Sequence, residues 1–373
     1  MQKATNIDVK KINRRSVARY IFDKKTTSRQ QISFDLQISI PTVLQIVKEL
    51  QGMGLICEAG QYTSTGGRKA VMIGSVPESH YVIGLDITRH HVGTVLLNLA
   101  GDVMNLKRIR CNYENKKEYY MNLGRLVDVF IEENQISPEK ILGVGVSLPG
   151  TVNVEQTLLI DSYVLDVYDV PTSVFSQNIH YPCYFLNDAN AGGLSEVFGG
   201  KSDKTMMYLS LSNSIGGAVF VNGELSIGKN CRCGEFGHMR LVPGGKICYC
   251  GQAGCVDAYC SALRLLELGD NSLEEFFAGL ESKEPEHVKF WEHYLDYLAI
   301  AIVNLQMAFD SDIVLGGYVG AWLQPWLKEL NERVDRLSPF KQETHTLRTG
   351  CFKNEAAAYG AATRLIERYF DEL

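Results

Sequence analysis

The sequence contains no long apolar run. None of its hydrophobic stretches approaches the roughly 18 consecutive residues that indicate a membrane-spanning helix. The opening segment MQKATNIDVKKINRRSVARY is basic, but it holds neither the apolar core nor the cleavage site of a secretory signal. We therefore expect a cytoplasmic protein with no membrane partner. Disulfides are rare in that compartment, so clustered cysteines favour metal binding.

Charge is ordinary in amount but uneven along the chain. The 373 residues are 45% hydrophobic and 21% charged, with a net charge of −6, which is typical of a globular protein with two or three domains. Residues 1–75 hold twelve Lys or Arg and five Asp or Glu, a net charge of +7, which leaves −13 for the remainder. A small basic segment ahead of a large acidic one indicates a nucleic-acid-binding domain, although a solvated basic face would look the same.

Residues 1–78 carry the pattern of a winged helix-turn-helix domain. Ser39 is placed to cap a helix with Pro41 in its first turn, and an apolar stripe follows at helical spacing. A shorter helix capped by Thr27 or Ser28 precedes it, and two short strands around Gly66-Gly67 predict a wing. Protein binding is the alternative use of such a domain, but the basic charge favours DNA. The residues expected to contact DNA are Arg29, Ser39, Pro41, Thr42, Gln45, Arg68 and Lys69.

From residue 79 onward, strands alternate with helices. This alternation over about 290 residues predicts an α/β body in two lobes. We expect the first lobe to comprise residues 79–190, completed by the C-terminal helix at 354–373. The second lobe is expected to comprise residues 191–353.

A histidine and three closely spaced cysteines stand out in the second lobe. His238, Cys248, Cys250 and Cys255 supply one imidazole and three thiolates, the donor set of a closed tetrahedral zinc site. Buried free thiols and a disulfide pair are the alternatives. Cys231, Cys233 and Cys260 lie close enough in sequence to offer a rearranged ligand set.

Several motifs give the chain a family resemblance along essentially its whole length. These are IPTVLQIVKEL and TGGRKA in the first domain, then VSLPG (146–150), LNDANA (186–191), EFGH (235–238) and CYCGQAGCVD (248–257). The chain resembles the ROK family of repressors, open reading frames and sugar kinases, whose bodies have the actin/hexokinase-like (ribonuclease H-like) fold. The first domain is similar to the winged helix of the family's repressors.

The resemblance implies a ligand set and a zinc site. The implied zinc is structural and is held by His238, Cys248, Cys250 and Cys255. The implied sugar-binding residues are Gly150, Asn187, Asp188, Glu235, His238 and Asp257. Asp188 aligns with the general base of the family's kinases. The family usually has Glu where this chain has Asp257, which puts sugar identity in doubt because the carboxylate is one methylene shorter.

The two phosphate-binding loops of the family's kinases are altered. The loop that usually resembles DxGGTK is DITRHH here (86–91), so Thr88 and Arg89 replace two glycines. The second loop, usually GTGIGAG, is SNSIGGA (212–218), with Ser212 and Ser214 in place of glycines. Glycines let the backbone approach phosphate oxygens, so their loss predicts that nucleotide no longer binds. Binding of a sugar phosphate by Arg89 and His90 is a less favoured use of the first loop.

The sequence therefore predicts a regulator and no enzyme. We expect a sugar-responsive DNA-binding transcriptional regulator, a repressor, whose kinase-derived body senses a sugar or sugar derivative. It is expected to bind an inverted-repeat operator as a homodimer, with a tetramer as the alternative assembly. A sugar kinase with an accessory DNA-binding domain is the second hypothesis, and a regulator controlled by a protein partner is the third.

Overall fold

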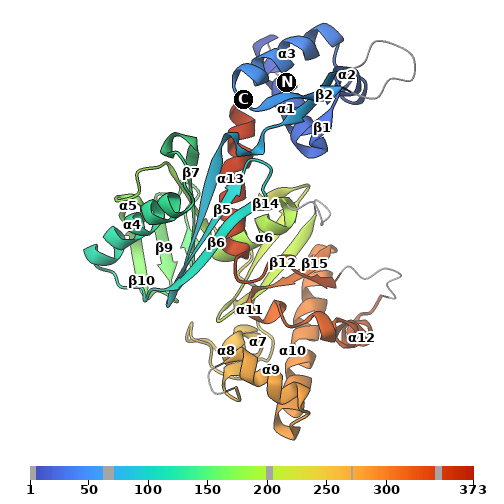
Figure 1. The fold of residues 1–373 in the computed structure, drawn as a ribbon. Coiled ribbons are helices and arrows are strands. Elements are labelled where there is room, and N and C mark those ends of the chain that lie inside the picture. Colours follow the sequence, from blue (N-terminus) through green and yellow to red (C-terminus); the bar gives the residue numbers. More distant parts are fainter. Residues whose placement is uncertain (1–5, 62–70, 199–204, 270–271, 341–346) are drawn as a thin grey trace.

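A computed structural model describes residues 6–61, 71–198, 205–269, 272–340 and 347–373. Along the chain come a small N-terminal head and then two five-stranded sheets, each with its own helices (Figure 1). Within the described residues, no helix combines the length and apolarity needed to cross a bilayer.

The head consists of three helices and a small antiparallel sheet in the order β1-β3-β2. Its elements are α1 (Asn6–Lys24), β1 (Thr26–Thr27), α2 (Arg29–Leu36), α3 (Ile40–Gly52), β2 (Ile56–Gln61) and β3 (Val71–Ser75). Ser28 and Ser39 cap α2 and α3, because their side chains accept hydrogen bonds from backbone amides one turn ahead. The predicted apolar stripe of α3 is buried. Two capped helices followed by two antiparallel strands are the described parts of the head that the predicted winged helix-turn-helix would use.

The first sheet has the strand order β11-β7-β4-β5-β6. Its elements are β4 (Tyr81–Ile87), β5 (His91–Asn98), β6 (Val103–Arg110), β7 (Ile141–Leu148) and β11 (Cys183–Asn187). Alternate residues of β4 face opposite sides: Ile83 packs with α4 (Lys117–Glu133), and Val82 packs with α13 (Ala356–Glu372). A small antiparallel sheet of β8 (Thr151–Val152), β9 (Leu158–Ser162) and β10 (Val167–Pro171), with α5 (Ser173–Ser176), extends this unit.

The second sheet has the order β14-β13-β12-β15-β16. Its strands are β12 (Met206–Leu211), β13 (Ile215–Val221), β14 (Glu224–Ser226), β15 (Asp312–Gly316) and β16 (Leu347–Thr349). Its helices are α7 (Asp257–Cys260), α8 (Ala262–Leu266), α9 (Leu273–Glu281), α10 (Pro285–Phe309), α11 (Gly317–Gly320) and α12 (Leu327–Leu337). The core is aromatic, with Trp291 and Tyr294 of α10 stacked and fully buried.

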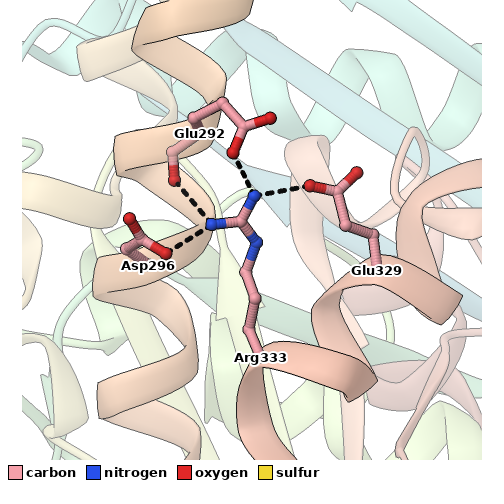
Figure 2. A network of polar contacts seen from close by, with 4 residues as sticks. All are labelled: Glu292, Asp296, Glu329 and Arg333. Carbon is pink, nitrogen blue, oxygen red and sulfur yellow. Dashed lines mark hydrogen bonds and ion pairs between the residues drawn. The ribbon is translucent and has the colours of Figure 1, made fainter. Parts of the chain in front are cut away.

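One arginine holds α12 against α10. The guanidinium of Arg333 contacts the carboxylates of Glu292 and Asp296 on α10 and lies 2.6 Å from Glu329 on its own helix (Figure 2). Arg333 is 8% exposed, whereas its partners reach solvent. A buried guanidinium needs such partners because an unpaired charge in the interior is costly.

The C-terminal helix α13 connects the units. It packs against α6 (Asp188–Phe198) so closely that a Cβ at Gly360 would lie 1.7 Å from the Ala191 carbonyl oxygen. At its other end, Phe370 meets Phe22 of the head with ring centroids 5.0 Å apart, and Asp371 lies 3.0 Å from Arg19. Figure 1 shows this red helix running from the sheets to the head.

Candidate functional site

A first cavity, of about 320 Å³, is lined by residues from both sheet units. Five of the six predicted sugar-binding residues line it: Gly150, Asn187, Asp188, Glu235 and His238. The sixth, Asp257, is 4% exposed and is not part of the cavity lining. Its carboxylate accepts a hydrogen bond of 2.7 Å from the backbone amide of Ile215. In this structure, Asp257 therefore supports the strand that borders the cavity.

Gly150 shapes the floor of the first cavity. Its φ angle of 140° is one that side chains rarely adopt, and a Cβ there would lie 2.2 Å from the Asp161 carbonyl oxygen. The amide of Asn187 donates hydrogen bonds of 3.0 Å to the Gly150 carbonyl oxygen and to Asp188 Oδ1. These hydrogen bonds hold the Pro149-Gly150 turn against the end of β11 and the start of α6.

Asp188 is the first residue of α6, and its Oδ1 accepts a 2.8 Å hydrogen bond from the backbone amide of Ala189. Burial, followed by the nearby Asp86 carboxylate, raises the pKa of Asp188 to about 7. Burial also raises the pKa of Asp86 to about 6, although a hydrogen bond from Ser147 opposes the shift. Two buried carboxylates thus lie near each other at the junction of the units.

The predicted metal ligands form one cluster. The candidate ligand atoms of His238, Cys248, Cys250 and Cys255 all lie within 4.8 Å of one another. Tetrahedral sulfur ligands about 2.3 Å from zinc are about 3.8 Å apart. The Sγ atoms of Cys250 and Cys255 are 3.8 Å apart, and His238 Nδ1 lies 3.9 Å from Cys248 Sγ. The donor set and its spacing therefore fit a metal ion.

A second cavity, of about 220 Å³, lies beside the first and shares Asp188 with it. Both altered loops line it, through residues 88–91 and 212–214. Arg89 is anchored there, because its guanidinium donates a 3.0 Å hydrogen bond to the Leu165 carbonyl oxygen. Arg108 and Lys353 add two positively charged side chains to the lining of the second cavity, and Tyr318 also lines it.

The family model described as the ROK family matches residues 82–368, which is more than half of the chain. The chain belongs to the ROK family. The xylose repressor of Bacillus subtilis (strain 168) is 27% identical over 365 residues, covering 96% of this chain and 90% of that protein. The DNA-binding transcriptional dual regulator NagC of Escherichia coli (strain K12) is 26% identical over 284 residues, covering 75% of this chain and 69% of that protein.

Solved structures confirm the predicted α/β fold class. A ROK family transcriptional regulator, described as a homologue of the E. coli MLC protein, has a TM-score of 0.80 at 21% identity. That match covers 98% of this chain and 97% of the other. A ROK family glucokinase from Streptomyces griseus, solved with glucose and AMPPNP, has a TM-score of 0.65 at 20% identity. It covers 76% of this chain and 98% of the kinase, so repressor-like and kinase-like ROK proteins share this architecture.

In the head of this ROK protein, five of the seven predicted DNA-contacting residues lie on α2 and α3 or at the N-terminus of α3. Arg29 opens α2, Ser39 caps α3 and Pro41 is exposed in its first turn. Gln45 is exposed and donates a 3.1 Å hydrogen bond to Glu49, while the Thr42 hydroxyl lies 2.8 Å from that of Ser39. The predicted wing-tip residues Arg68 and Lys69 lie outside the described residues.

Motif reasoning missed several residues of the ROK site. Asp161 and the exposed Tyr163 enter the first cavity from the small sheet, and Tyr163 meets Tyr249 with ring centroids 5.3 Å apart. Asp161 accepts a 3.1 Å hydrogen bond from Thr151. Of these, only Tyr249 had a sequence signal, its place between two predicted metal ligands. In the head, the sequence patterns also did not single out Leu44, an apolar residue of α3 that is 45% exposed and is not part of the buried stripe.

Proposed function

We propose that this ROK protein is a sugar-responsive DNA-binding repressor whose body binds a sugar and performs no phosphoryl transfer. The similarity to proteins named xylose repressor and transcriptional dual regulator NagC supports this assignment. A winged helix-turn-helix head joined to a cavity rich in hydrogen-bonding groups has the two parts that such a regulator needs.

The head supplies the DNA-binding part of the proposal. Helix α3 projects Gln45 from the face opposite its buried stripe, and the half-buried Thr42 lies at the flank of that face, so these side chains can meet base edges in the major groove. The wing tip, with Arg68 and Lys69, is assigned to the phosphate backbone or the minor groove. A homodimer would present two such heads, which suits an inverted-repeat operator.

The first cavity supplies the sugar-binding part. Asn187, Asp188 and Glu235 offer amide and carboxylate groups to sugar hydroxyls, and ionised acceptors make stronger hydrogen bonds than neutral ones. A ligand that favours one arrangement of the two sheet units would shift the population of DNA-competent dimers. In this proposal His238 belongs to the sugar cavity and to the metal cluster, so ligand and metal share one loop.

We assign the metal as structural zinc. One imidazole and three thiolates fill four positions and leave none for a reacting water. When bound, zinc would crosslink the segment carrying His238 to the loop carrying the cysteines. These residues would thereby hold Glu235 and Tyr249 in place at the cavity wall.

The observation that carries the non-enzymatic assignment is the second cavity. Phosphoryl transfer depends on loops that cradle phosphates through their backbone, together with a base. Here Thr88, Arg89 and Ser212 place side chains along that wall. One observation favours the kinase hypothesis: Asp188, with a pKa of about 7, would suit a general base. The loss of glycines from both loops outweighs it.

The DNA-binding proposal is tested by selecting an operator from a random DNA library with the wild-type protein. Gln45→Ala should weaken binding to that operator by about 1–3 kcal/mol and relax preference at one base position per half-site. Gln177→Ala changes an exposed glutamine of the body and should leave operator binding unchanged. Unchanged affinity and preference in Gln45→Ala would remove this residue from the interface.

The sugar-sensing and kinase hypotheses separate in two assays on the same preparation. A sugar that binds the wild type should release it from the selected operator, and Asp188→Asn should need more sugar for the same release. ATP turnover should remain at background with every sugar tested. Sugar-dependent ATP turnover that disappears in Asp188→Asn would overturn the repressor assignment in favour of a kinase.

A further inference from the structure

Helix α3 of the head carries two large apolar side chains that its core does not use. Ile40 is 41% exposed and Leu44 is 45% exposed, and both lie outside the buried stripe of the helix. They are four residues apart, so their side chains lie one above the other along the helix, and we call them the apolar row. Single apolar residues on a surface are ordinary, so what the row contacts has to be argued from its surroundings.

The apolar row lies beside polar side chains that suit nucleic acid. Gln45 follows Leu44 directly and is exposed. Lys48 is exposed four residues after Leu44, so it continues the row toward the end of the helix. An exposed amide and an exposed ammonium are groups that bind base edges and phosphates. The two aliphatic side chains therefore stand on a surface that is otherwise equipped for DNA.

Negative charge on α3 is confined to one residue, which is already paired. Glu49 is the acidic residue of this helix, and its carboxylate lies 2.8 Å from Lys10 Nζ and 3.6 Å from Arg14 Nη1 on α1. Glu49 lies five residues after Leu44, which places it about 140° around the helix from the row. Because residues 1–75 carry a net charge of +7, the surface around the row favours a polyanion.

Thymine is the base that offers an apolar group in the major groove. Its 5-methyl group projects there, whereas guanine, adenine and cytosine present hydrogen-bonding groups. An aliphatic side chain against those groups would displace water without replacing its hydrogen bonds, which costs free energy. An apolar row on a helix in the major groove is therefore satisfied by thymine and disfavours the other bases.

The small size of the row also favours DNA over a protein. A stable protein interface buries roughly 800 Å² on each partner, which is far more than two partly exposed aliphatic side chains provide. Contact with a methyl group needs a single side chain. A row of two, flanked by an amide and an ammonium, thus matches base edges better than it matches a second protein surface.

We propose that Ile40 and Leu44 are specificity-determining residues that contact the 5-methyl groups of thymines in each operator half-site. This inference rests on the proposed DNA-binding function and deepens it by naming the base that α3 prefers beside Gln45. Four residues of helix rise by about 6 Å, and stacked base pairs are about 3.4 Å apart. The two thymines of a half-site therefore lie about two base pairs apart.

The first experiment removes methyl groups and leaves the rest of the operator unchanged. Deoxyuridine pairs as thymidine does but lacks the 5-methyl group. It is substituted in turn for each thymine of one half-site in the operator selected with the wild-type, full-length protein. We expect thymines whose methyl group contributes about fourfold to affinity, the value of one buried methyl group. Wild-type affinity that deoxyuridine leaves unchanged at every position would overturn the proposal.

The second experiment removes the side chain as well. Leu44→Ala should weaken binding to the thymine operator by about fifteenfold, because both half-sites lose a contact, and deoxyuridine at the contacted thymines should cause no further loss. Ile40→Ala should behave in the same way at thymines about two base pairs away. Both residues are exposed and alanine favours a helix, so the variants should unfold at the wild-type temperature. Equal losses with deoxyuridine in the wild type and in both variants would overturn the proposal.

Two variants serve as matched controls. Leu337 ends α12 in the second sheet unit and is 49% exposed, so Leu337→Ala removes a similar side chain and should keep the wild-type response to deoxyuridine. Gln45→Ala should bind the thymine operator more weakly and still lose about fourfold with deoxyuridine, because it leaves the apolar row in place. Loss of this response in Gln45→Ala would show that any weakening of α3 hides the methyl groups, which contradicts a defined contact.

Failure of this inference is distinguishable from failure of the proposed function. If the library yields no preferred sequence, the DNA-binding function and this inference fall together. If it yields an operator whose affinity does not depend on thymine methyl groups, the function stands and this inference alone falls. A lower molar mass of Leu44→Ala in light scattering, with its response to deoxyuridine unchanged, would assign the row to an interface between copies of the chain and overturn the contact with thymine.

Discussion

The two neighbouring cavities share a wall but differ in chemistry. The first presents amide and carboxylate groups, from Asn187, Asp188 and Glu235, beside the metal cluster. The second presents Arg89, Arg108 and Lys353 beside an uncapped helix end. The first suits the hydroxyls of a neutral ring, and the second suits an anion.

This difference shows how one architecture serves two kinds of protein. The chain shares its fold with a ROK glucokinase at a TM-score of 0.65, although the identity is 20%. In the function proposed above, a few loop residues separate the two uses, such as Thr88 and Arg89, where the family resemblance predicts glycines in the kinases. Function follows from the side chains that line the cavities, whereas the fold supplies their positions.

The largest effect is expected from breaking the metal cluster, which belongs to the first cavity alone. Cys250→Ser should release zinc, because it removes one of four ligands that together supply about 10–16 kcal/mol of apparent binding free energy in small zinc domains. Sugar binding should fall with it, since Glu235 and Tyr249 are attached to the same loops. Metal analysis and calorimetry measure both results.

A cysteine outside the cluster provides the control for this variant. Cys57→Ser alters an exposed head cysteine and should keep its zinc. Native protein that is folded without zinc would contradict the assignment of the metal.

The next effect concerns the shared wall and pH. The pKa of Asp188 is about 7 in the fold, against 3.8 as its ordinary value, so the protonated form is favoured by folding. Its contribution to stability is complete below pH 3.8 and is lost as pH rises through about 7, a difference of about 4 kcal/mol. Relative to wild type, Asp188→Asn should therefore gain about 4 kcal/mol of stability at pH 8.5 and less than half of that at pH 5.

Urea unfolding at these two pH values measures the change. Asp23→Asn is the control, since it alters an exposed carboxylate of the head and should shift neither value. A wild type and an Asp188→Asn variant that differ equally at both pH values would show that the buried carboxylate of Asp188 does not titrate in this range.

A smaller effect is expected from one carboxylate of the first cavity. Glu235→Gln keeps the shape of the side chain and removes its charge, so sugar affinity should fall about tenfold, the value of one charge-assisted hydrogen bond. Calorimetry with a sugar that releases operator DNA measures the change, and an unchanged affinity would remove Glu235 from the sugar site.

Local sequence patterns predicted the elements whose formation depends on residues close together in the chain. Ser39 caps α3 and Pro41 lies in its first turn, because capping depends on residues within one turn of helix. The stripe of Val43, Ile46 and Leu50 is buried because its spacing matches the helical period. The same local logic placed the helix after Asn187-Asp188, although the lobe boundary predicted at residue 190 falls inside α6.

These local patterns could not predict how segments that are distant in the sequence pack together. The motifs made no prediction for α10, although it forms the core of the second sheet unit, because its apolar residues surround more than one face. They also did not predict the 2.7 Å hydrogen bond that the Asp257 carboxylate accepts from the Ile215 amide of a neighbouring strand. Asp161 and Tyr163 have no motif at all and reach the first cavity only through the small sheet.

The ROK family, the α/β class and the clustering of one histidine with three cysteines could be predicted from the sequence, since each depends on residue type at short spacing. Which of these residues share a cavity depends on how distant segments pack. Arg108 and Lys353 are 245 positions apart, and Asp86 and Asp188 lie on different elements, so their common environment arises only when α13 packs between the sheets. Charge and pKa depend on such neighbours through distance and burial, which sequence separation does not encode.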